Sequence, residues 1–316
     1  MILAASMVAL LTALPGHTDT TITVQKGVRL EVSNFTGGVS VKTWDRDAVR
    51  IQADHHTRTR VGIESHADRL QISSEGDRGT PGSVEYRITT PSWMALDITG
   101  PFSDVDVEGS KGDVKVETVK GDVSVLGGSG TLDLSSVEGD VSVAGAHGRM
   151  KLSSINQAVT VSKVVGQIEA ETVNGDVVLD DVQLDALDAS SVGGNVWFNG
   201  ELKERGHYQL QSHSGNIEVV AADRPNAAIT VSTFSGDFSS DFDVMLTGSH
   251  KREFQFTLGN GAAQLQLESF SGNIRLLKAS AVEALRARLK SRPVVVGGEK
   301  EKKAKNKDKD KDKDNN

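Results

Sequence analysis

A fixed period of 18 residues constrains the fold of this chain more than any other feature. From Leu96 onward, each period holds two short segments in which apolar and polar residues alternate, and such alternation is typical of half-buried β-strands. The paired apolar residues are Leu96/Ile98, Val114/Val116, Leu132/Leu134, Met150/Leu152 and Ile168/Ala170 in one row, with Val105/Val107, Val123/Val125, Val141/Val143, Val159/Val161 and Val177/Leu179 in the other. Self-similarity at a fixed period is the signature of a repeat architecture. We therefore predict an all-β, single-stranded β-solenoid (β-helix) with two strands per coil.

The same pattern continues beyond residue 180 in longer coils, of about 18–21 residues. Nine coils at about 4.8 Å each would form a platform about 43 Å long. Between the apolar residues of the first strand, the outward positions carry charges of alternating sign, which predicts attractive pairs between neighbouring parallel strands. These positions are Asp97, Lys115, Asp133, Lys151 and Glu169.

The pattern divides the chain into five segments. We predict a signal peptide at 1–17, an all-β region that leads into the solenoid at 18–92, and the solenoid itself at 93–278. A hairpin of 241–246 with 253–258 is expected before the last coil. A short helix at 279–293 ends at Pro293. The tail at 294–316 is expected to be disordered, because its Lys/Asp-rich part from Glu299 to Asn316 has no large apolar residue to bury.

Composition excludes several classes of protein. The net charge of -8 and the absence of a basic stripe argue against a nucleic-acid partner. The chain has no Cys, so disulfides and Cys-based metal sites are excluded. No segment reaches the roughly 18 apolar residues of a transmembrane span. We expect an exported monomer of the periplasm, cell surface or medium.

Two polar rows accompany the turns. An acidic ladder consists of Asp104, Asp122, Asp140, Asp176 and Asp237, of which all but Asp104 follow a turn glycine, and these side chains could cap the turns or ligate Ca²⁺. Ala158 interrupts this ladder, and Asn replaces Asp in three coils. A Ser/Thr row stands three residues before each turn glycine or its equivalent: Thr118, Ser136, Ser154, Thr172, Ser191, Ser212, Thr233 and Ser269. No base recurs beside these hydroxyls, so we interpret them as a structural ladder.

Trp197 is the one candidate ligand contact, because it takes an outward position beside Phe198. We predict no catalytic residues, no cofactor-binding residues and no metal ligands. The alternative is a carbohydrate-active β-helix that binds or cleaves polysaccharide near Trp197 and the hairpin at 241–258. The apolar phases do not follow the six-residue rule of hexapeptide acyltransferases.

The order of the motifs carries a family resemblance. Gly37-Gly38-Val39-Ser40-Val41 is followed by Trp44-Asp45-Arg46-Asp47, by Pro91 and by a run of Gly-Asp-Val-x-Val repeats. In this order the chain resembles the putative-adhesin family of bacterial envelope proteins (domain of unknown function 4097) over roughly residues 25 to 278. The resemblance implies a non-enzymatic β-solenoid at the cell envelope, for adhesion or as an envelope-stress-associated binding scaffold. Its partner would be a surface protein or a glycan.

Overall fold

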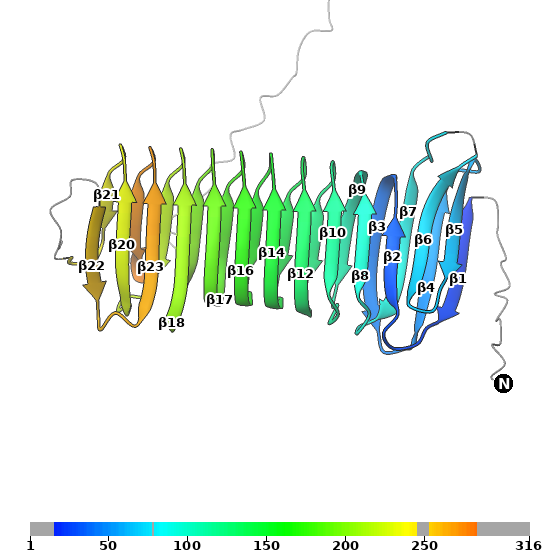
Figure 1. Ribbon diagram of the computed structural model, residues 1–316, viewed down its shortest axis with the longest axis horizontal. Helices are drawn as coiled ribbons and strands as arrows, with labels where there is room; N and C mark the ends of the chain where they lie inside the picture. The colour runs from blue at the N-terminus through cyan, green and yellow to red at the C-terminus, as the bar shows by residue number, and fades with distance from the viewer. Residues whose placement is uncertain (1–15, 78, 245–252, 283–316) are drawn as a thin grey trace, which may run out of the picture.

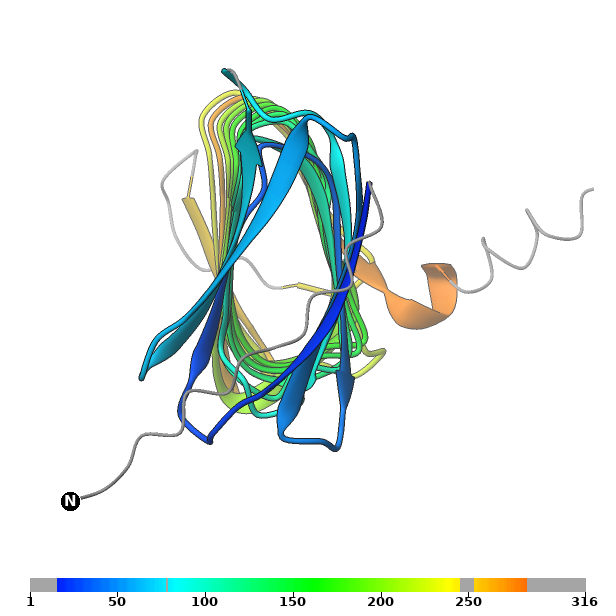
Figure 2. The same cartoon turned by 90° about the vertical axis from the view of Figure 1, so that its right-hand side faces the viewer.

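Two long ladders of strands face each other across a narrow core (Figure 1). The computed structural model describes residues 16–77, 79–244 and 253–282. Seen end-on, the chain winds as a flattened oval, with the turns at its two narrow ends (Figure 2). The predicted all-β solenoid is confirmed.

Each ladder is a continuous series of hydrogen-bonded strands. Ladder A has the order β5-β6-β2-β8-β10-β12-β14-β16-β17-β18-β23-β20-β22, and ladder B the order β1-β4-β7-β3-β9-β11-β13-β15-β17-β18-β19-β24-β21. The long strands β17 and β18 contribute their first halves to ladder B and their second halves to ladder A.

The strand bounds follow the predicted half-repeat. Ladder A contains β5 (Thr59–Ser65), β6 (Arg69–Gly76), β2 (Arg29–Ser33), β8 (Leu96–Gly100), β10 (Val114–Thr118), β12 (Ser129–Ser136), β14 (His147–Ser154), β16 (Val165–Thr172), β23 (Ala263–Ser269), β20 (Ala227–Thr233) and β22 (Glu253–Leu258). Ladder B contains β1 (His17–Thr23), β4 (Ala48–His55), β7 (Val84–Pro91), β3 (Thr36–Trp44), β9 (Phe102–Glu108), β11 (Val123–Leu126), β13 (Val141–Ala144), β15 (Val159–Ser162), β19 (Ile217–Ala221), β24 (Ile274–Lys278) and β21 (Phe238–Ser240). Both ladders share β17 (Val177–Ser191) and β18 (Val196–Ser212).

The middle coils stack in sequence order with the predicted register. Lys115 lies opposite Asp97 on one side and Asp133 on the other. Lys151 lies opposite Asp133 and Glu169, and its Nζ is 2.7 Å from the Glu169 carboxylate. The inward residues of both ladders are almost fully buried, with Leu134 and Val123 at 0% exposure. A shift of one residue would turn this apolar set outward, so burial fixes the register.

At the N-terminal end, spatial order departs from sequence order. Strands β2 and β3 stack directly on β8 and β9, although 51 residues separate Trp44 from Leu96 in the chain. The later strands β6 and β7 lie outside them. Antiparallel strands then cover this end: β5 pairs with β6, β4 with β7, and β1 with β4.

The C-terminal end repeats this interleaving. Strands β23 and β24 insert between the coil of β18/β19 and the coil of β20/β21, which precedes them in sequence. Strand β22 covers β20 in antiparallel orientation. The expected hairpin is therefore wrong in its pairing, since 253–258 pairs with β20 and residues 241–244 form no strand.

The remaining terminal predictions fall mostly outside the described residues. Of the predicted helix, 279–282 are described and helical. The predicted signal peptide up to residue 15 and the charged tail lie outside. None of the described helical residues forms a segment long and apolar enough to cross a membrane.

Candidate interaction surfaces

The Ser/Thr row lies at the turn that joins ladder A to ladder B. In five coils the hydroxyl accepts the N–H of its own turn residue and donates to a carbonyl of the neighbouring coil: Ser154, Thr172, Ser191, Ser212 and Ser269. Ser191 Oγ accepts from Gly194 N at 2.9 Å and donates to Gly175 O at 2.9 Å. Ser212 makes the equivalent bonds with Gly215 and Gly194, at 2.8 and 3.0 Å. These hydroxyls are therefore fully used within the stack and unsuited to act as nucleophiles.

The turn glycines allow the coils to approach each other closely. A Cβ atom on Gly194 would lie 1.9 Å from the carbonyl oxygen of Gly175, and one on Gly215 would lie 1.9 Å from that of Gly194. Glycine at these two positions therefore serves the close approach of the coils rather than a positive φ, while Gln157 takes the equivalent position in one coil.

The acidic ladder bonds between coils. Asp122 N donates to Asp104 Oδ1 at 2.9 Å, and Asp140 N donates to Asp122 Oδ1 at 2.8 Å. Asparagine serves equally well, since Asn216 N donates to Asn195 Oδ1 at 2.9 Å. The side chains predicted to cap their turns thus bond to the backbone of the next coil. This row of bonds ends at Ala158, which has no side-chain acceptor. Within the described residues, no group of three His, Asp or Glu side chains is placed to hold a metal ion.

A row of mostly apolar, exposed or half-buried side chains runs along the same turns, and all of them except Pro101 come directly after a row hydroxyl. This turn ridge consists, in spatial order, of Pro101, Val119, Val137, Ile155, Val173, Val192, His213, Phe270 and Phe234. Successive turns are tied by backbone bonds, such as Asn174 N to Ile155 O at 2.8 Å. Val192 is 51% exposed and Ile155 44% exposed. The turns that carry the ridge form the upper edge in Figure 1.

The ridge becomes aromatic at its C-terminal end. The rings of His213 and Phe270 stack with centroids 4.8 Å apart, and those of Phe270 and Phe234 stack at 4.7 Å. These spacings match the distance between coils, so the interleaved order of the strands creates the stack. This ridge was not predicted from the sequence, although an apolar residue follows all but one of the row hydroxyls.

Trp197 lies on the opposite side of the coil from ladder A. It is half-buried in β18, between Val178 and Glu218 of the neighbouring strands. With Asn195 and Asn216 it lines a small hollow of about 280 Å³. Its role as a ligand contact stays a prediction.

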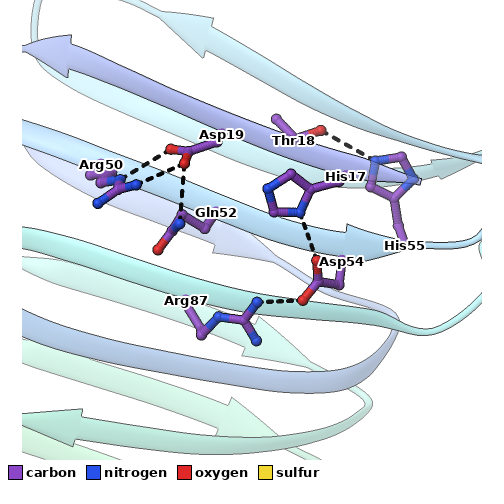
Figure 3. A network of polar contacts seen from close by, with 8 residues as sticks. All are labelled: His17, Thr18, Asp19, Arg50, Gln52, Asp54, His55 and Arg87. Atoms are coloured by element: carbon purple, nitrogen blue, oxygen red, sulfur yellow. Dashed lines mark hydrogen bonds and ion pairs between the residues drawn. The ribbon is translucent and has the colours of Figure 1, made fainter. Parts of the chain in front are cut away.

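A polar network fastens the outermost strand β1 (Figure 3). Asp19 accepts two hydrogen bonds from the Arg50 guanidinium, which lowers the pKa of this carboxyl. Asp54 contacts the His17 ring at 2.7 Å and the Arg87 guanidinium, and these two bonds lower its pKa. Because Asp19 and His17 belong to β1 while their partners belong to β4, the network anchors the end of ladder B.

These features define a β-solenoid whose coils stack mainly in parallel and present regular outer surfaces. The chain belongs to the Toastrack DUF4097 family, whose model matches residues 29–277. This confirms the family resemblance expected from the sequence.

Two solved structures are similar to the chain. A protein described as a putative adhesin from Bacteroides fragilis is 12% identical, with a TM-score of 0.44, covering 83% of this chain and 96% of that one. A protein described as a putative cell adhesion protein from Clostridium sporogenes is 10% identical, with a TM-score of 0.23, covering 82% and 99%. No curated protein matched the chain.

Proposed function

We propose that this protein is an exported, non-enzymatic binding scaffold of the bacterial cell envelope, of the adhesin type, and that it contacts a partner through the turn ridge. The observation that carries the proposal is the ridge itself. Large exposed hydrophobic residues usually occur singly on a protein surface. Here Val119, Ile155 and Val192 lie in one line. Aligned apolar side chains with a polar border are typical of an interaction surface.

The surroundings of the ridge favour a broad contact. The next position along the turn carries Asn156, Asn174, Gly193, Ser214, Ser271 and Ser235 over the C-terminal part, all of them uncharged. Removing a charge from water costs free energy. A partner could bury this part of the ridge without that cost, because the neighbouring side chains are uncharged. The hydrogen-bonded turns hold the side chains in place, so little order has to be gained on binding.

Export is supported by the apolar leader of the sequence. Gly16 and His17 are built into the fold, because the Gly16 carbonyl accepts the His55 N–H at 2.9 Å and His17 bonds to Asp54. We therefore expect signal cleavage, where it occurs, to leave these two residues on the mature chain. Sequencing the N-terminus of the secreted protein measures this.

The ridge is tested with a triple variant, Ile155→Ser, Val173→Ser and Val192→Ser. Binding of the purified protein to intact cells of its source bacterium should fall at least tenfold, which is about 1.4 kcal/mol. The matched control is Leu126→Ser, since Leu126 is 55% exposed but lies away from the ridge. Equal binding by the triple variant, Leu126→Ser and the unaltered protein would contradict the proposal.

Carbohydrate binding is the second candidate function. The observation that favours it is a groove across the outer face of ladder A, along which glutamine and charged side chains are arranged. The groove lies on the opposite side of the coil from Trp197, and at its C-terminal end it reaches β20, which pairs directly with the strand at 253–258.

A further inference from the structure

The outer face of ladder A has a groove of about 750 Å³ that crosses seven neighbouring strands, β12, β14, β16, β17, β18, β23 and β20. It follows the valley between two outward rows and runs along the solenoid axis. Its floor is strand backbone. With six intervals of about 4.8 Å, the groove is about 29 Å long.

The side chains along the groove are rich in groups that both donate and accept hydrogen bonds. Four glutamines line it, Gln167, Gln209, Gln264 and Gln266. In the described part of the chain, none of these four amides has a hydrogen-bond partner. Each amide has two donor hydrogens and an acceptor oxygen to offer a ligand.

Charged groups lie mainly toward the N-terminal part of the groove. Glu169 and Asp188 occupy directly opposed positions on neighbouring strands. Lys151 pairs with Glu169 at 2.7 Å, and with Asp133 and Arg149 this part holds three acidic and two basic side chains. The carboxylates can accept hydrogen bonds from hydroxyl groups, while the mixed charge disfavours a highly charged polymer.

The shape and the chemistry select among classes of ligand. The strands that form the floor are paired on both sides, so a peptide cannot add to the sheet here as an extra strand. An apolar chain would bury the amides and carboxylates of the groove without giving them hydrogen-bond partners, which costs free energy. An extended polysaccharide presents a hydroxyl row, and each unit of an extended β-linked glycan advances by nearly the spacing between coils.

We propose that this groove binds a linear, uncharged β-linked polysaccharide along the solenoid axis, with one sugar unit per coil. Gln209 and Gln266, which are neighbours in register, would bond the hydroxyls of adjacent units. The proposal rests on the proposed role as a binding scaffold and names a ligand class for it. The groove and the turn ridge are separate surfaces, so one can fail without the other.

The test uses the full chain and three probes, the β-1,4-linked hexasaccharides of glucose, xylose and N-acetylglucosamine, measured by isothermal titration calorimetry. At least one of them should bind. The double variant Gln209→Ala/Gln266→Ala should weaken that binding at least tenfold. A second variant, Ala228→Trp, should weaken it as well, because a bulky side chain would fill the groove at its C-terminal end.

The matched control is Gln211→Ala. Gln211 has the same outward orientation on the same strand as Gln209 but does not line the groove, so binding should be unchanged. Absence of binding by all three hexasaccharides would overturn the proposal, as would an equal effect of the control and the double variant. If the unaltered protein attaches to cells through the ridge while no hexasaccharide binds, the groove proposal falls and the scaffold function stands.

Discussion

The middle of the solenoid and its two ends differ in the order in which their coils stack and in the direction of their strand pairing. In the middle, from β8 to β18, each coil stacks on the one before it in sequence, and parallel pairing continues without interruption. At the ends, a coil from one part of the chain inserts between two others, and antiparallel strands cover the outside except where ladder B ends in β21, which pairs in parallel with β24. The repeat therefore propagates the stack, while interleaving terminates it.

The ends teach how a solenoid avoids growing from copy to copy. A parallel edge with unpaired N–H and C=O groups would invite pairing with another chain. Here ladder A ends in β5 and β22, both antiparallel, and ladder B ends at the N-terminal side in β4 and β1. Because β2 and β23 are each held between two strands, unravelling either end requires breaking several ladders together.

The largest difference between middle and end is expected for the turn glycines. Gly194→Ala places a Cβ against the Gly175 carbonyl and should cost about 3 kcal/mol, in the range of backbone and overpacking effects. Gly27→Ala, in the turn before β2, has open space around the added atom but a φ of +95°, so it should cost only about 1–2 kcal/mol. Urea unfolding of both variants measures this, and equal losses would contradict close packing as the cause.

Removing a hydroxyl of the Ser/Thr row should also cost more stability in the middle of the solenoid than at its end, but the difference should be smaller than for the glycines. Ser191→Ala removes the partner of both Gly194 N–H and Gly175 C=O and should cost about 2 kcal/mol. Thr233→Ala, in the outermost coil, removes the acceptor for Gly236 N–H and should cost about 1 kcal/mol. The neighbouring outward Ser190→Ala serves as the control in the same thermal and urea measurements, with no expected loss. A Ser191→Ala variant as stable as that control would remove the hydroxyl ladder from the account.

The smallest effect is a response to acid that distinguishes the ends from the middle. The pKa values of Asp19 and Asp54 are lowered in the fold, so their stabilisation of β1 is complete above about pH 4, the unfolded value, and is lost as the pH falls through their folded values. Partial burial and the charge of Glu169 raise the pKa of Asp188 in the middle, so acidification relieves a penalty there.

Hydrogen exchange at pH 6 and pH 3.5, corrected for intrinsic rates, measures this contrast. Protection in β1 should fall at the lower pH, while protection in β16 and β17 is retained. Asp19→Asn, which cannot pair as a charge with Arg50, should already show weak protection of β1 at pH 6. Loss of protection in the middle before β1 would contradict the role of the polar network.

The sequence predicted the content of the coils but not their order in space. Period, register and charge alternation follow from side chains that face inward or outward, so Lys115 and Asp133 could be paired from the sequence alone. The segments around Leu265 and Ile229 carry the same apolar frame, so either fits beside Tyr208. The repeat period therefore does not indicate which of the two segments lies beside Tyr208.

The surfaces were predicted unevenly for a similar reason. Trp197 drew attention as a single large residue, whereas the ridge and the groove arise from modest residues aligned by stacking. Gln209 and Gln266 are 57 residues apart in sequence and become neighbours only through the interleaved order. The period alone would have placed Gln209 beside Thr230.

The central claim, that the C-terminal coils interleave, can be tested directly because the chain has no cysteine of its own. Gln209 and Gln266 are opposed on adjacent strands about 4.8 Å apart, a separation that suits a disulfide, while Gln209 and Thr230 are separated by two strand spacings, about 10 Å. Two double-cysteine variants, Gln209→Cys/Gln266→Cys and Gln209→Cys/Thr230→Cys, should be oxidised and mapped by mass spectrometry. We predict an intramolecular disulfide in the first and none in the second, and the reverse result would show that the coils stack in sequence order.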